Sequence, residues 1–189
     1  MSNLTINFSI KEFRPNGQSS SWIPDFKLQT IFIQELANSL QIIRNMFGKP
    51  LIIGNGIRGA SDFMRLIEKG YHPSPTSDHF FGNVVPIGAP HRLYPILGHY
   101  YSFSVGAADV ISDNPMGLFN LAIQLNESGK TSFGQIIHET DPIKKTEWVH
   151  FGNKREKFYS EIICNLIGKE KYLYTIDGGI TYQPYRAVL

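Results

Sequence analysis

The chain has 189 residues, of which 42% are hydrophobic, 13% aromatic and 18% charged, with a formal net charge of +2. This composition is typical of one folded globular domain and excludes an intrinsically disordered chain. The mild, scattered positive charge argues against a nucleic-acid partner, and the single Cys164, inside an apolar run, is expected to be a buried structural thiol rather than a nucleophile.

The first third of the chain predicts a long helix, a buried strand and a short helix. Apolar residues recur at helical spacing over residues 28–43, and the pattern ends at Gly48. Residues 51–53 form a short apolar run, which favours a buried strand. Ser61 is placed to cap a short helix over residues 62–69.

The middle of the chain predicts a long loop, a strand and a helix. Residues 71–100 are rich in proline and glycine, which indicates loop structure with one hairpin at most. Residues 100–111 then predict a strand. Pro115 is placed to begin a helix that ends before Gly129.

The last third predicts two hairpins separated by a helix. Two strands, at residues 133–138 and 147–151, should pair in an antiparallel hairpin. Residues 155–167 predict an amphipathic helix, and residues 171–182 a second hairpin.

The N-terminus carries no basic stretch followed by an apolar run, and no apolar run approaches the length of a membrane span. We therefore expect a chain that is made and folded in the cytoplasm without a signal peptide and has no membrane span.

Three short segments contain histidine, a carboxylate residue or both: Ser77-Asp78-His79, Gly106-Ala107-Ala108-Asp109 and Glu147-Trp148-Val149-His150. A catalytic zinc ion takes three protein ligands and keeps one position open for water. His79, Asp109 and His150 meet this requirement, and all three fall beside predicted strand ends or turns. The sequence therefore predicts a zinc site.

Two further kinds of residue belong to such a site. Glu147 lies three positions before His150, so we predict that it is the base that takes a proton from water. Glu139, which ends the preceding strand and could face Glu147 across the hairpin, is the alternative base. Arg58 follows a buried strand and could hold an oxyanion or a substrate carboxylate, or form a surface ion pair.

The order Arg58, Ser77-x-His79, Ala107-x-Asp109 and Glu147-Trp148-Val149-His150 resembles the zinc D-alanyl-D-alanine carboxypeptidase family over about residues 8–160. The family includes phage cell-wall endopeptidases. The resemblance implies an α+β fold of the Hedgehog/DD-peptidase type, a small antiparallel sheet with helices packed on one side. It also implies that His79, Asp109 and His150 bind Zn²⁺ and Glu147 is the base. Arg58 would stabilise the transition state, and Ser77 and Trp148 would contact the substrate.

The chain departs from the family pattern between its first two ligands. The family keeps its first histidine and the aspartate seven positions apart, whereas thirty positions separate His79 from Asp109. We therefore predict a single domain over residues 1–189 with an insertion of about 23 residues at about 83–104. His99, ten positions before Asp109, is the alternative first ligand; His79 is favoured because Ser77 and Gly82 flank it in the family manner.

The predicted function is zinc-dependent hydrolysis of peptide bonds in the stem peptides of bacterial peptidoglycan, as a carboxypeptidase or an endopeptidase, for example a phage lysin acting on the cell wall. The alternative is a phage virion or tail component that keeps the peptidase fold and binds virion partners. A third hypothesis is a module that binds a peptide without cutting it.

Overall fold

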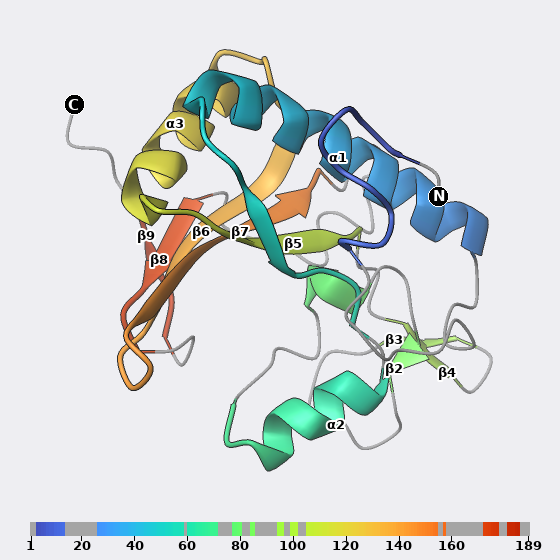
Figure 1. The fold of residues 1–189 in the computed structure, drawn as a ribbon. Helices are drawn as coiled ribbons and strands as arrows, with labels where there is room; N and C mark the ends of the chain where they lie inside the picture. Colours follow the sequence, from blue (N-terminus) through green and yellow to red (C-terminus); the bar gives the residue numbers. More distant parts are fainter. Residues whose placement is uncertain are drawn as a thin grey trace.

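The computed structural model describes residues 3–13, 26–58, 60–71, 77–80, 84–85, 94–96, 99–101, 105–154, 157, 172–177 and 181–185. Within these residues the fold is a six-stranded sheet with helices, which confirms the α+β prediction (Figure 1). The strands, in spatial order, are β1 (Ile52–Asn55), β5 (Ala107–Ile111), β7 (Thr146–Asn153), β6 (Phe133–Asp141), β8 (Tyr172–Thr175) and β9 (Gln183–Pro184). The helices are α1 (Phe26–Phe47), α2 (Ala60–Glu68) and α3 (Pro115–Glu127).

The sheet is mostly antiparallel rather than wholly so. Its central hairpin pairs β6 with β7 from Phe133↔Asn153 to Asp141↔Thr146, as the sequence predicted, although both strands are longer than expected. On the far side of β6, however, β8 runs parallel to it. Parallel neighbours need a crossover connection, and the chain between β7 and β8 is long enough to provide one.

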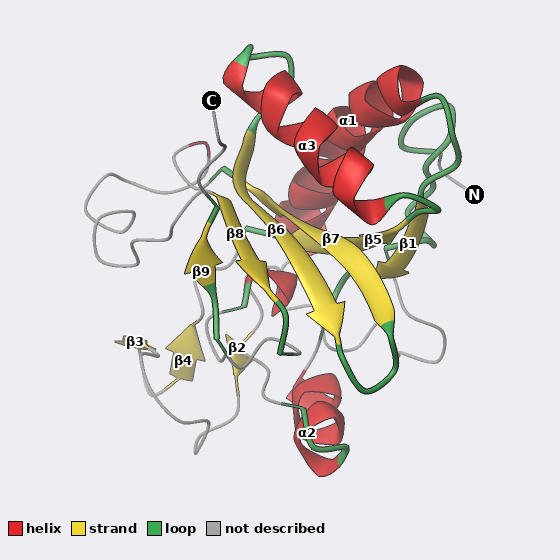
Figure 2. Ribbon diagram, turned by 90° about the vertical axis from the view of Figure 1, so that its left-hand side faces the viewer, coloured by secondary structure: helices red, strands yellow, loops and turns green. Residues whose placement is uncertain are grey.

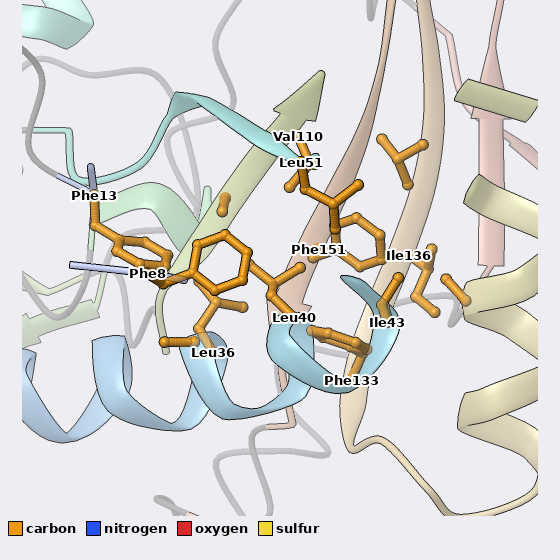
Figure 3. Close-up of a cluster of buried hydrophobic side chains, with 14 of the residues drawn as sticks. Phe8, Phe13, Leu36, Leu40, Ile43, Leu51, Val110, Phe133, Ile136 and Phe151 are labelled. Carbon is orange, nitrogen blue, oxygen red and sulfur yellow. The ribbon is translucent and has the colours of Figure 1, made fainter. Parts of the chain in front are cut away.

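Helices α1 and α3 lie together over one face of the sheet (Figure 2). The residues between the helices and the sheet form the hydrophobic core. Figure 3 shows its centre, where α1, β5, β6 and β7 contribute large apolar side chains together with the N-terminal segment: Phe8, Phe13, Leu36, Leu40, Ile43, Leu51, Val110, Phe133, Ile136 and Phe151. Since side chains alternate between the two faces of a strand, the residues next to these core positions point to the other face.

Two local predictions were wrong. Ser61 does not cap α2, because that helix already includes Ala60. The predicted strand over residues 100–111 is two strands, β4 (His99–Tyr101) and β5. Gly106, between them, has a φ of 90°, which lies outside the extended region and suits glycine.

The predicted insertion contains a second, three-stranded sheet in the order β2 (Val84–Val85), β4 and β3 (Tyr94–Ile96). A 3₁₀ turn, η2 (Asp78–Phe80), precedes it. Most other residues of the insertion lie outside the described residues, as do Cys164 and, apart from residue 157, the predicted helix at 155–167. In place of the hairpin predicted at 171–182, β8 pairs antiparallel with β9, which lies just beyond the predicted bounds. Among the described helices, none is both long and apolar enough to cross a membrane.

Candidate metal centre

Three buried side chains from η2, β5 and β7 meet on the face of the sheet opposite to α1 and α3. Asp109 and His150 are paired directly across β5 and β7. His79 Nε2 lies 2.9 Å from Asp109 Oδ1 and 3.1 Å from His150 Nδ1, and His150 Nδ1 lies 3.0 Å from the same Asp109 oxygen. The structure thus brings together the three predicted metal ligands, and we call them the triad.

Backbone hydrogen bonds hold the η2 turn against the sheet. The N–H of Arg58 donates to the carbonyl of His79 (2.7 Å), and the N–H of Gly106 donates to the carbonyl of Asp78 (3.0 Å). Ser77 Oγ accepts from the N–H of His79 (3.4 Å) and is buried. Ser77 therefore shapes the turn that presents His79; a contact with substrate remains a prediction.

The ring of His79 is oriented for coordination through Nε2. Its Nδ1 lies 2.7 Å from the carbonyl oxygen of Gly56, which can only accept, so Nδ1 carries the proton. Burial, followed by the charge of Arg58, lowers the pKa of His79 to about 4, against the attraction of Asp109. The ring is therefore neutral near pH 7, and its Nε2 presents a lone pair.

Asp109 is the anionic centre of the triad. Burial alone would raise its pKa, but its neighbours, first His79 and then His150 and Arg58, together hold that pKa well below its usual range. Its second oxygen, Oδ2, accepts from Asn55 Nδ2 and Arg58 Nη2, each at 3.1 Å. The carboxylate is thus ionised and fixed in orientation.

The donor set of the triad fits a divalent cation. The Nε2 lone pair of His79 faces a carboxylate oxygen at 2.9 Å, a contact between two acceptors that a cation between them would make favourable. Ligand atoms about 2.0–2.1 Å from a tetrahedral ion are about 3.3 Å apart, which is close to the three distances of the triad. Two imidazoles and one carboxylate can therefore hold a metal ion with little movement.

The structure does not bring Glu147 to the triad. Glu147 is an odd number of residues before His150 on β7, so it projects from the opposite face of the strand. Its Oε2 lies 3.1 Å from Nε2 of His138, which packs against the ring of Phe119 on α3. The role of Glu147 as a base stays a prediction that this placement disfavours.

Glu139 lies on the same face as the triad. It pairs across the hairpin with Trp148. This pair lies two residues along the strands from the pair Ile137↔His150, so both pairs project from the same face. Burial, and then the charge of Asp109, raise the pKa of Glu139 to about 7, while His150, Arg58 and the Trp148 indole oppose the rise. Charges in and beside the triad therefore act on the pKa of Glu139, and the carboxyl group is near its protonation midpoint at neutral pH.

Tyr182 and Asn55 complete the surroundings and were not identified from the sequence. Burial together with the Glu139 carboxylate raises the pKa of Tyr182, which places this phenol in the surroundings of Glu139. No local motif marks either residue, because both depend on strand pairings between distant segments.

The alternative ligand His99 lies on β4 of the three-stranded sheet. Among the described residues, the group that could hold a metal ion contains His79 instead. No family model matches the chain, and neither a curated protein nor a solved structure matches it. The interpretation of the site rests on the geometry of its own side chains.

A Gly56→Ala substitution is expected to disturb both the fold and the triad. An added Cβ would lie 2.3 Å from the carbonyl oxygen of Phe13, so the backbone must shift, and with it the carbonyl that orients His79. We expect a loss of about 1–3 kcal/mol of stability and about 10–100-fold in metal affinity. Thermal denaturation and a zinc competition titration measure these effects.

Gly54→Ala is the matched control for Gly56→Ala. Its Cβ would crowd only the flexible side chain of Ile111, at 2.8 Å, and would meet the carbonyl oxygen of Asp109 at an ordinary 3.5 Å, so metal affinity should change little. An unchanged metal affinity in Gly56→Ala would show that the Gly56 carbonyl does not orient the ligand.

Proposed function

We propose that this chain is a zinc-dependent peptidase of the DD-peptidase type that hydrolyses peptide bonds in the stem peptides of bacterial peptidoglycan. The observation that carries the proposal is the buried triad with an ionisable carboxylate, Glu139, on the same face of the sheet. The arrangement of α1 and α3 on one face of a mostly antiparallel sheet, and the order of the sequence motifs, support the fold family.

Zinc is the ion that the donor set favours. Two neutral imidazole nitrogens and one carboxylate oxygen form a ligand set common to catalytic zinc sites, with a further position left for water or substrate. A bound zinc ion supplies Lewis acidity, which polarises a carbonyl group and makes a water molecule easier to deprotonate.

Glu139 is the residue best placed to accept the proton of the attacking water. A base works best when its pKa lies near the working pH, and that of Glu139 is raised to about 7. Once protonated, the same carboxyl group can donate the proton to the leaving amine. Tyr182, which lies in the surroundings of Glu139, can donate a hydrogen bond that holds the carboxylate in one orientation during both steps.

Arg58 has a double role in the proposal. Its Nη2 donates to Asp109 Oδ2, which fixes the central ligand. Its guanidinium is only partly buried, with a side-chain exposure of 16%, so it can also stabilise negative charge that develops on a substrate carbonyl oxygen.

The test is digestion of purified peptidoglycan and of defined stem peptides, followed by mass spectrometry of the products. We expect zinc-dependent cleavage of one peptide bond, which also identifies the enzyme as a carboxypeptidase or an endopeptidase. Zinc-loaded protein that leaves all stem peptides intact would contradict the proposal and would favour a peptide-binding or virion-structural role.

A further inference from the structure

A pocket of about 560 Å³ extends from the triad towards the tip of the β6–β7 hairpin. Its lining includes Asn55 of β1, Asp109 and Ile111 of β5, Pro115 at the start of α3, Lys145 in the turn before β7, and residues 146–148 of β7. The volume suits a short peptide.

One wall of the pocket is an open strand edge. The pairing of β5 with β7 ends at Val110↔Val149, whereas β6 stays paired with β7 as far as Asp141↔Thr146. Residues 146–148 therefore have β6 on one side and the pocket on the other. An extended peptide can continue the sheet there by pairing with β7.

Lys145 lies at the hairpin end of this wall in an unusual conformation. Its φ is 53°, and it is the one non-glycine residue with positive φ among those the structure describes. The left-handed region costs an L-residue about 1–2 kcal/mol and is normally given to glycine or asparagine at such a turn. A lysine kept at this position points to a use for its side chain.

The charge of Lys145 is also uncompensated within the described part of the chain. The other charged residues that line the pocket have partners there, since Asp109 binds Arg58 and Glu147 contacts His138. The neighbouring Lys144, by contrast, lies 3.8 Å from Asp141 and over the ring of Tyr71. Lys145 thus offers the pocket a free cation.

We propose that Lys145 is a specificity residue that binds a carboxylate of an acidic peptide lying in extended form along β7. The inference rests on the proposed peptidase function and adds a substrate requirement to it. Lys145 is five residues from His150, or about 16 Å along the strand. After allowance for the length of the lysine side chain, the recognised carboxylate should lie about two to four residues from the bond that is cut.

The experiment compares Lys145→Met with the wild type on matched peptides. One peptide carries its carboxylates free, and two others have either the C-terminal or the side-branch carboxylate converted to an amide. We expect Lys145→Met to raise KM for the acidic peptide about tenfold or more with little change in kcat, as for loss of a charge-assisted hydrogen bond. The wild type should show the same rise in KM with the peptide in which an amide replaces the recognised carboxylate.

Two variants control for charge and backbone. Lys144→Met removes an adjacent lysine and should leave KM unchanged. Lys145→Arg should keep most of the preference for the acidic peptide over the amidated peptides. Lys145→Gly, which suits the positive φ, should lose this preference without lowering the melting temperature. Equal KM values for acidic and amidated peptides in the wild type, or an equal effect of Lys144→Met and Lys145→Met, would overturn the inference.

Binding of the same peptides by calorimetry separates this inference from the proposed function. If the zinc protein cleaves nothing but binds the acidic peptide in a Lys145-dependent way, the peptidase proposal fails and the recognition site stands. If it cleaves acidic and amidated peptides equally well, the peptidase proposal stands and the role of Lys145 fails.

Discussion

Replacement of Glu139 by glutamine is expected to lower kcat by about 10²–10⁴-fold, the usual contribution of a general base. The amide keeps the size of the side chain but cannot accept the proton. Because Glu139 is not a member of the triad, zinc should still bind with one equivalent, which metal analysis would establish. Steady-state kinetics on a stem peptide would measure the loss.

Glu147→Gln is the matched control for Glu139→Gln. Glu147 contacts His138 on the helix side of the sheet, so its amide should change kcat by only a few fold. A large loss in Glu147→Gln together with near-normal activity in Glu139→Gln would reverse the assignment. It would also require the start of β7 to rearrange when substrate binds.

The activity of the wild type should also fall in acid. Only the ionised form of Glu139 accepts a proton, and the pKa of this group in the metal-free protein is raised to about 7. A bound cation would favour the ionised form, so the acidic limb of the profile should lie below that value. The pH profile of the residual activity of Glu139→Gln should lack this acidic limb.

The sequence predicted the three side chains that meet in the triad but favoured Glu147 over Glu139 as the base, whereas the structure places Glu139 on the face of the triad; strand geometry explains the difference. His79, Asp109 and His150 were found because ligand chemistry restricts the residue types and the motifs give their order. The choice of Glu147 depended on a turn that would feed the strand just before His150. In the structure β7 already includes Thr146, and the alternation of side chains along that strand turns Glu147 away.

Partners supplied by distant pairings could not be predicted. Asn55 reaches Asp109 because β1 pairs with β5, and Tyr182 reaches Glu139 because β8 and β9 follow β6 in the sheet. Neither pairing leaves a local pattern in the sequence. The break at Gly106 was missed for another reason: residues on both sides of it are apolar or aromatic and resemble one continuous strand.

Zinc should stabilise the folded protein strongly. At a free zinc concentration about 1,000 times Kd, binding to the native state alone adds about 4 kcal/mol, or roughly 8–16 °C in melting temperature for a domain of this size. His150→Ala should abolish this increase because it removes one of three ligands. His138→Gln, which alters a histidine on the other face, should retain it.

The stability of the metal-free protein should depend on pH through His79. The folded-state pKa of about 4 is below the ordinary value of 6.5, so between these values the unfolded chain binds more protons. The free energy of unfolding therefore rises with pH across this window, and about 3 kcal/mol is lost as pH falls from 6.5 to 4. The lowered pKa of Asp109 acts in the same direction at still lower pH.

Chemical denaturation of the wild type and His79→Gln at several pH values would measure how the free energy of unfolding depends on pH. An equal slope in both proteins would show that His79 is not held neutral. Since a neutral His79 is also what a cation requires, zinc affinity and stability should decline together in acid.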